Sequence, residues 1–76
     1  MNIKYQDLIT LDDDNEYIVV SKIVHKEKDY IYIVDINNNQ NMKFMKIDND
    51  GYLIELNYKD DEKLIKELIP LFLMQR

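Results

Sequence analysis

One stretch near the middle of the chain, residues 29–36, limits the choice of folds more than any other. It reads Asp-Tyr-Ile-Tyr-Ile-Val-Asp-Ile, and β-branched and aromatic residues of this kind favour strands. Because the side chains of a strand alternate between two faces, its two tyrosines point one way while Ile31 and Ile33 point the other. Both faces are apolar, which indicates a strand in the middle of a sheet rather than at its edge.

Apolar runs separated by polar turn residues predict four further strands. Residues 12–15 (Asp-Asp-Asp-Asn) supply the first turn, because their short side chains hydrogen-bond the backbone. Gly51, the only glycine, supplies the positive φ of a tight hairpin. The second run changes the parity of its apolar residues at Ser21, which indicates a bulge or a bend. The five strands are expected at residues 5–11, 16–26, 29–37, 42–48 and 52–58.

An asparagine-rich stretch, residues 37–41, lies between the third and fourth predicted strands. Such a composition occurs in linkers and prion-like segments, but five residues between two strand patterns are typical of a loop. We therefore predict a loop here. In the last strand the alternation predicts one apolar face made of Tyr52, Ile54, Leu56 and Tyr58.

The apolar period changes to that of a helix after residue 58. The apolar positions recur at i, i+1, i+4, i+5 and i+8, and Asp60 or Asp61 can cap the N-terminus. Pro70 cannot donate a hydrogen bond to the carbonyl group of Lys66, so the regular helix is expected to end near Ile69 or to kink there. The helix is predicted at residues 60–69, followed by an apolar tail at 70–76. The apolar stripe at helical spacing consists of Leu64, Ile65, Leu68, Ile69 and Phe72.

These elements predict a single α+β domain over residues 1–76. Its sheet is a curved antiparallel meander of about five strands, and one C-terminal helix packs on one face. The apolar tail either adds a helical turn that completes a thin core or stays partly exposed and contacts a partner. An open face that contains tyrosines would be a further contact surface. The candidate partner-contact residues are Tyr30, Tyr32, Phe72 and Met74.

Charge and composition exclude several classes of partner. The chain has fifteen acidic and ten basic residues, a net charge of −5, and Arg76 as its only arginine. The negative electrostatic field of the protein therefore repels polyanions, and arginine side chains that could grip phosphates are almost absent. We expect no direct nucleic-acid binding. No apolar run is long enough to span a membrane, and the N-terminus lacks a signal-peptide core. The absence of cysteines fits a reducing compartment, and a cytoplasmic location is expected.

The residues needed for catalysis or metal binding are largely absent. His25 is the only histidine and Ser21 the only serine, and four strand residues place them roughly 13 Å apart along the backbone. The acidic turn around Gly51 fails the spacing of a calcium-binding loop at both of its ends. A single glycine excludes a glycine-rich phosphate loop. We therefore expect a protein that is not an enzyme, with no cofactor, metal ion or small-molecule substrate.

Several short motifs of this chain occur in a recognisable order: residues 11–19 (Leu-Asp-Asp-Asp-Asn-Glu-Tyr-Ile-Val), 28–33 (Lys-Asp-Tyr-Ile-Tyr-Ile), Phe44, 50–53 (Asp-Gly-Tyr-Leu) and the closing helix with its acidic start. In this order they resemble the YrzB-like family of small acidic bacterial proteins. The resemblance covers about residues 5–72, and the chain departs from the family pattern at its asparagine-rich stretch and at Pro70. It implies the α+β fold and no catalytic residues, because the function of the family is unknown.

Two function classes fit this sequence. The first is a small intracellular protein-interaction or regulatory module, in which a sheet face, an edge strand or the apolar tail receives a protein partner or a second copy. The alternative is an acidic mimic of nucleic acid that occupies a basic groove on a DNA- or RNA-binding protein. The alternative needs carboxylates gathered on one face, whereas this sequence interleaves them with lysines, so the first class ranks higher.

Overall fold

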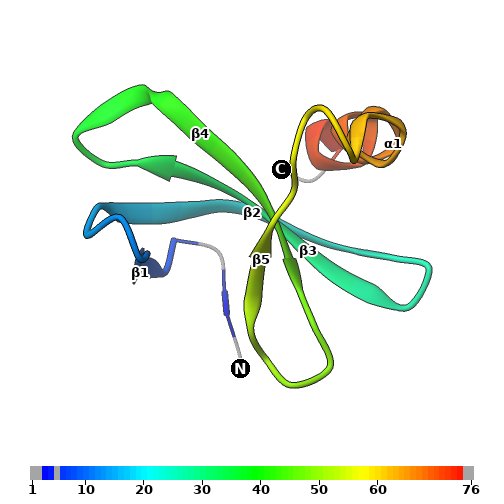
Figure 1. Cartoon of the computed structure of the whole chain (residues 1–76), viewed down its shortest axis with the longest axis horizontal. Helices are drawn as coiled ribbons and strands as arrows, with labels where there is room; N and C mark the ends of the chain where they lie inside the picture. The colour runs from blue at the N-terminus through cyan, green and yellow to red at the C-terminus, as the bar shows by residue number, and fades with distance from the viewer. Residues whose placement is uncertain (1–2, 5, 75–76) are drawn as a thin grey trace.

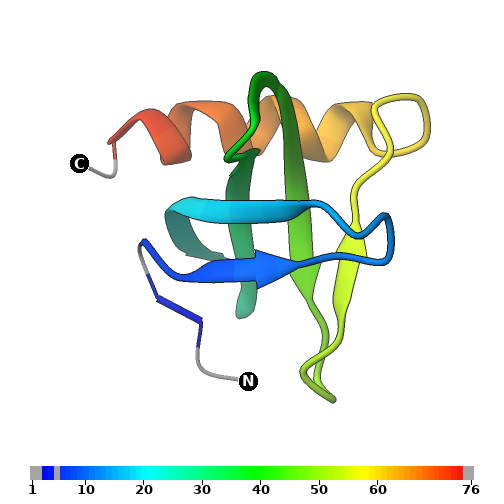
Figure 2. The ribbon, with the colours of Figure 1, turned by 90° about the vertical axis from the view of Figure 1, so that its left-hand side faces the viewer.

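The computed structural model describes residues 3–4 and 6–74. Its strands form one antiparallel sheet in the order β1-β2-β3-β4-β5, so the stretch that contains Tyr30 and Tyr32 is the central strand, as predicted. The sheet is curled, and α1 lies on one side of it (Figures 1 and 2). The predicted α+β class is confirmed. The elements are β1 (Leu8–Thr10), β2 (Glu16–His25), β3 (Lys28–Asp35), β4 (Asn38–Ile47), β5 (Leu53–Glu55) and α1 (Glu62–Met74).

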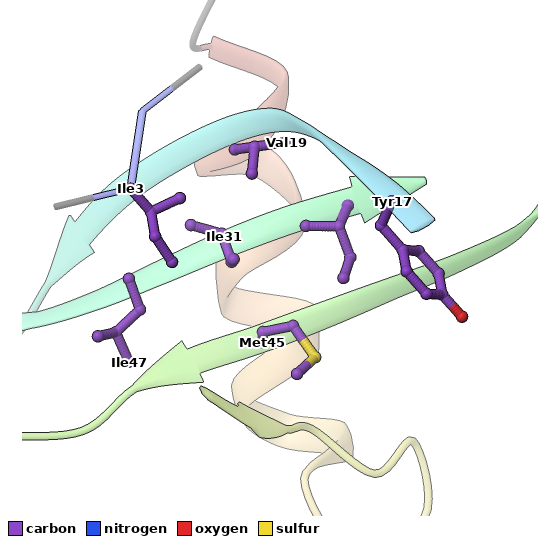
Figure 3. Packing of buried hydrophobic residues seen from close by; sticks show 7 residues of the cluster. Ile3, Tyr17, Val19, Ile31, Met45 and Ile47 are labelled. Carbon is purple, nitrogen blue, oxygen red and sulfur yellow. The ribbon is translucent and has the colours of Figure 1, made fainter. Parts of the chain in front are cut away.

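Each face of the sheet carries its own apolar cluster. The inner cluster lies inside the curl, where Ile31 of β3 is fully buried and Ile3 of the N-terminal segment packs beside it (Figure 3). The helix-side cluster joins Tyr30 and Phe44 to the buried stripe of α1. The central strand thus contributes side chains to both clusters, which is why both of its faces are apolar. The stripe residues buried in the helix-side cluster are Ile65, Leu68 and Phe72.

A bulge in β2 lets that strand serve both clusters as well. Val19 pairs with Ile33, but Ser21 pairs with Tyr32, so Val20 has no partner in the β3 register. One extra residue in a strand reverses the face of every residue that follows. Val19 therefore points into the inner cluster, whereas Ile23 packs in the helix-side cluster. The bulge predicted from the change of parity is confirmed.

The helix does not end near Ile69, which corrects the predicted boundary. α1 continues through Pro70 to Met74, so residues 71–74 form a further helical turn. Pro70 and Lys66 are both exposed, so water can satisfy the carbonyl group that Pro70 leaves without a donor. Phe72 is buried in the helix-side cluster, and this packing offsets the missing hydrogen bond. Asp61 directly precedes the helix, but its carboxylate accepts from the backbone N–H of Asn57.

The asparagine-rich stretch is not a five-residue loop. β4 already begins at Asn38, and the turn before it is only Ile36–Asn37. Asp35 pairs with Asn38 and Val34 pairs with Met42, so residues 39–41 form an irregular bulge inside the strand. Polar contacts described below hold this bulge. The sequence pattern missed it because the partners that stabilise it are distant in the chain.

The two edge strands are shorter than predicted. β1 and β5 have three residues each, and Leu56 after β5 is buried in the helix-side cluster. The predicted apolar face of the last strand is mostly exposed, since Tyr52, Ile54 and Tyr58 all contact solvent. The parts of the first strand and of the tail predicted at Tyr5 and at residues 75–76 lie outside the described residues.

Candidate functional site

An open apolar groove lies between the helix side of the sheet and the C-terminal half of α1. Its volume is about 880 Å³, within the range of pockets that bind ligands or partner side chains. The sheet forms one wall, Ile69 and Leu73 of α1 form the other, and Tyr58 lies on the connection between them. The lining residues are Val20, Ser21, Lys22, Tyr32, Met42, Phe44, Tyr58, Ile69, Phe72 and Leu73.

Aromatic packing builds this groove. The ring of Tyr32 stacks on that of Phe44 at 5.1 Å between centroids, and Phe72 packs against Phe44 at 5.5 Å. Tyr58 meets Phe44 edge-on at 6.1 Å. Rings at these separations attract one another beyond the burial of their area. Helix, sheet and connection are therefore joined at Phe44, which gives the groove an aromatic base.

Two polar features distinguish the groove. The hydroxyl of Tyr32 donates to Sδ of Met42 at 2.8 Å, and burial raises the pKa of Tyr32 with a smaller contribution from Tyr58. Ser21 is buried, and its Oγ has no hydrogen-bond partner among the described residues. An unpaired buried hydroxyl is costly, and here it results from the bulge, which turns Ser21 toward the groove.

The lining has little charge in a chain that is strongly acidic. Lys22 is its only charged residue, and none of the lining residues, all from the described part of the chain, carries a carboxylate. The chain as a whole has a net charge of −5. The groove is therefore the place where an apolar segment can approach without leaving a carboxylate desolvated.

The four predicted contact residues divide between core and surface. Tyr30 is only 4% exposed and belongs to the helix-side cluster. Tyr32 and Phe72 line the groove with ring centroids 6.0 Å apart, although Phe72 itself is mostly buried. Met74 is 79% exposed at the end of α1 and is not a lining residue. The tyrosine face is thus covered by the helix at Tyr30 and opens at Tyr32.

Sequence reasoning missed the other groove residues. Val20, Met42 and Tyr58 come from the bulge, from the start of the regular β4 pairing and from the connection to the helix. Their juxtaposition depends on the curl of the sheet, which no local pattern encodes. The one signal in the sequence for these groove residues was the apolar character of Leu73. If the helix continued past Pro70, Leu73 would lie beside Ile69 on the same face.

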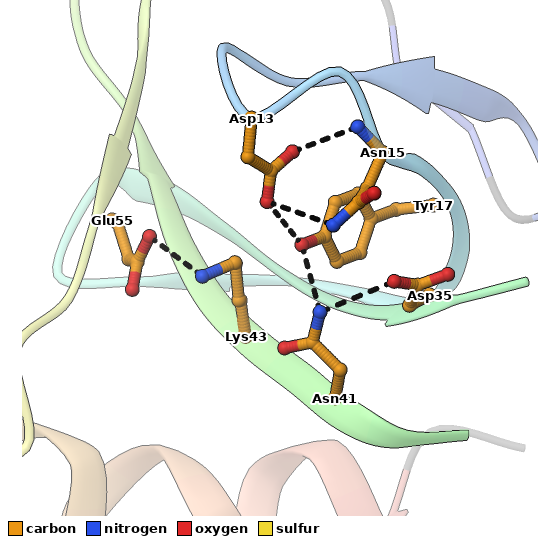
Figure 4. A network of polar contacts seen from close by, with 7 residues as sticks. All are labelled: Asp13, Asn15, Tyr17, Asp35, Asn41, Lys43 and Glu55. Atoms are coloured by element: carbon orange, nitrogen blue, oxygen red, sulfur yellow. Dashed lines mark hydrogen bonds and ion pairs between the residues drawn. The ribbon is translucent and has the colours of Figure 1, made fainter. Parts of the chain in front are cut away.

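A network of polar contacts surrounds the hydroxyl of Tyr17 on β2 (Figure 4). The Tyr17 hydroxyl donates to Oδ2 of Asp13 at 2.8 Å and accepts from Nδ2 of Asn41 at 3.1 Å. The same Asn41 nitrogen donates to Oδ2 of Asp35 at 3.2 Å. Asp35 is buried, and its other oxygen accepts from the backbone N–H of Asn37. The network joins the first turn to the β3–β4 hairpin and holds the bulge of β4.

The pKa shifts in this network follow its hydrogen bonds. Burial raises the pKa of Tyr17, and its bond to Asp13 raises it further. The backbone N–H of Asn15 lowers the pKa of Asp13, and the bond from Tyr17 adds to that effect. Where β4 pairs with the edge strand β5, Nζ of Lys43 lies 3.0 Å from Oε1 of Glu55. The hydrogen bond between them raises the pKa of Lys43. The contacts of Asn41 with Tyr17 and Asp35 join three different strands, so we assign the network to stability.

Two further side-chain contacts involve carboxylates of α1. Nε2 of His25 lies 3.5 Å from the carboxylate of Glu67 on α1, and Lys66 pairs with Glu62 on the exposed side of the helix at 2.9 Å. Across residues 3–4 and 6–74, no group of three or more histidine, aspartate or glutamate side chains is placed to hold a metal ion. In the same residues no helix is long and apolar enough to cross a membrane.

Comparisons with protein-family models, with curated proteins and with solved structures find no match. The resemblance to the YrzB-like family therefore stays a prediction, and the site must be interpreted from its own geometry.

Proposed function

We propose that this chain is a non-enzymatic protein-interaction module whose groove receives an apolar segment of a partner. The observation that carries the proposal is the groove itself. It is open and largely apolar, and it is built on an aromatic base at Phe44. Exposed apolar surface that is continuous with a groove is typical of association sites.

The surroundings of the groove support the same proposal. Met42, Ile69 and Leu73 all keep a large part of their surface in contact with solvent, so a partner gains apolar burial without displacing any element of the fold. Leu73 is the most exposed of the three at 66%. In protein contacts a few well-packed, fully desolvated residues near the centre supply most of the binding free energy, and the groove offers Tyr32 beside these three side chains.

The test is a selection of displayed random peptides on the immobilised full chain, with Leu73→Glu as the groove variant. Val24→Glu is the matched control, because Val24 is 67% exposed and lies outside the groove. This substitution adds the same charge as Leu73→Glu. We expect apolar peptides that bind the wild type and the control but not the groove variant. Selection of no peptide, or equal binding to all three proteins, would contradict the proposal.

Salt separates this proposal from the nucleic-acid mimic. An apolar contact survives about 0.5 M salt, because screening acts on charges and not on apolar burial. If the selected peptides are basic and are released at that salt concentration, the acidic surface rather than the groove is the binding site. That result would favour the mimic.

A further inference from the structure

We infer that the groove is filled by the end of α1 from a second copy of this chain, so that the protein forms a symmetric dimer through this face. The inference rests on the proposed function and names the partner. It begins with the last turn of the helix, where Leu73 and Met74 are 66% and 79% exposed. Two large apolar side chains in succession at a helix end remain in water unless something covers them.

The protein carries a projection and a recess of matching chemistry on one face. Leu73 both projects from α1 and lines the groove, and Met74 directly follows it. When a two-fold axis passes through such a face, the projection of each copy enters the recess of the other, and every contact occurs twice. A different partner would have to supply a projection of its own, whereas a second copy already has one.

Charge selects this face over the others for self-association. Two copies repel each other, because each has a net charge of −5. The groove lining has no carboxylate and one lysine, Lys22, whereas acidic residues occupy the turns at residues 12–14 and 48–50 and the start of α1. A groove-to-groove contact therefore brings no carboxylates of the two linings together, and Lys22 is the only charge that each lining contributes. The remaining long-range repulsion predicts that dimerisation becomes stronger as salt is added.

The interface has a defined set of walls. Ile69 and Leu73 lie on the helix side, and Val20 and Met42 lie across the groove on the sheet side. In the dimer the Leu73 side chain of each copy would lie between these walls in the other copy. A charge introduced on either wall would be desolvated there without a partner, so both walls can be tested separately.

The experiment is sedimentation equilibrium of the full chain over a range of concentrations, at low salt and at about 0.5 M salt, where screening is strong. We expect a monomer–dimer equilibrium that tightens with salt. Leu73→Glu and, on the opposite wall, Met42→Glu should each raise the dissociation constant at least about tenfold. Val24→Glu should leave it within about twofold, since distant surface changes have little effect. Circular dichroism confirms that each variant is folded.

Three outcomes would overturn the proposal of a dimer. These outcomes are a wild type that stays monomeric at every concentration, a dimer that persists in both groove variants, and a dimer that dissociates as salt is added. The proposed function is judged separately. If the wild type is monomeric but Leu73→Glu still abolishes the binding of selected peptides, the groove binds a different partner and only the dimer is excluded.

Discussion

Tyr17 links three parts of the chain through a single hydroxyl. It bonds Asp13 in the first turn and Asn41 in the β4 bulge, and its ring is fully buried in the inner cluster. Tyr17→Phe keeps the ring but removes both bonds, so we expect the free energy of unfolding to fall by about 1–2 kcal/mol. Tyr52→Phe, at an exposed ring, is the control and should change stability by less than about 0.5 kcal/mol.

The same substitution changes the pH dependence of stability. The pKa of Tyr17 is raised in the folded state, so its contribution is fully present below the unfolded value of about 10 and is lost as pH rises through the folded pKa. Tyr17→Phe should therefore flatten the alkaline part of the stability curve. Denaturant unfolding at a series of pH values measures this. An unchanged alkaline slope would show that the hydroxyl does not titrate in the way we describe.

Ser21 provides a second test at the residue scale. Its hydroxyl is buried without a hydrogen-bond partner among the described residues, so Ser21→Ala removes a polar group that folding desolvates. We expect the free energy of unfolding to rise by about 1 kcal/mol. The measurement is urea denaturation of variant and wild type. A loss of stability of similar size would mean that the hydroxyl is hydrogen-bonded, and the interpretation of the groove wall would be wrong.

At the scale of elements, Pro70 sits inside α1 at an exposed position. Pro70→Ala restores the N–H that the carbonyl group of Lys66 lacks, and it leaves no cavity. We expect the free energy of unfolding, measured by thermal unfolding, to rise by about 1–3 kcal/mol. The lower value is expected because water already hydrogen-bonds the carbonyl group of Lys66. Lys63→Ala on the same helix should be close to neutral. A destabilised Pro70→Ala variant would contradict the described course of the helix.

The β2–β3 turn is a second element with a local cost. Its two residues, Lys26 and Glu27, both have positive φ, at 51° and 68°, where a Cβ atom is unfavourable and glycine is preferred. Glu27→Gly should raise the free energy of unfolding by about 0.5–1 kcal/mol, whereas Glu27→Ala retains the Cβ atom and should not. Chemical denaturation of the pair checks this. Equal effects of the two substitutions would exclude backbone strain as the cause.

Elements whose cause is local could be predicted from the sequence. The central strand follows from its β-branched residues, the bulge from the change of parity at Ser21, and the tight turn from Gly51, whose φ is 86°. Elements that depend on contacts with residues distant in the chain could not be predicted from the sequence. Asn41 is held by Tyr17, which is 24 positions away, and the helix passes Pro70 because Phe72 is buried against the sheet. Propensity alone predicts a loop and a helix end at those two places.

At the scale of the whole molecule, the groove results from combining these departures. The bulge brings Val20 and Ser21 to its wall, and the extended helix brings Leu73 to the opposite wall. Of the predicted contact residues only Tyr32 and Phe72 line it. The tyrosine-bearing strand and the apolar tail predicted an apolar contact surface, but its place depends on the curl of the sheet. The fold was therefore more predictable than the site.

Methyl NMR spectroscopy of the full chain tests most directly whether this groove is the contact surface. Spectra are recorded as the protein concentration is raised and as a selected peptide is added. We predict chemical-shift changes concentrated on the methyl groups of Val20, Met42, Ile69 and Leu73, with Val24 unchanged. Changes confined to β1, to β5 or to Val24, with the groove methyl groups unaffected, would contradict the account.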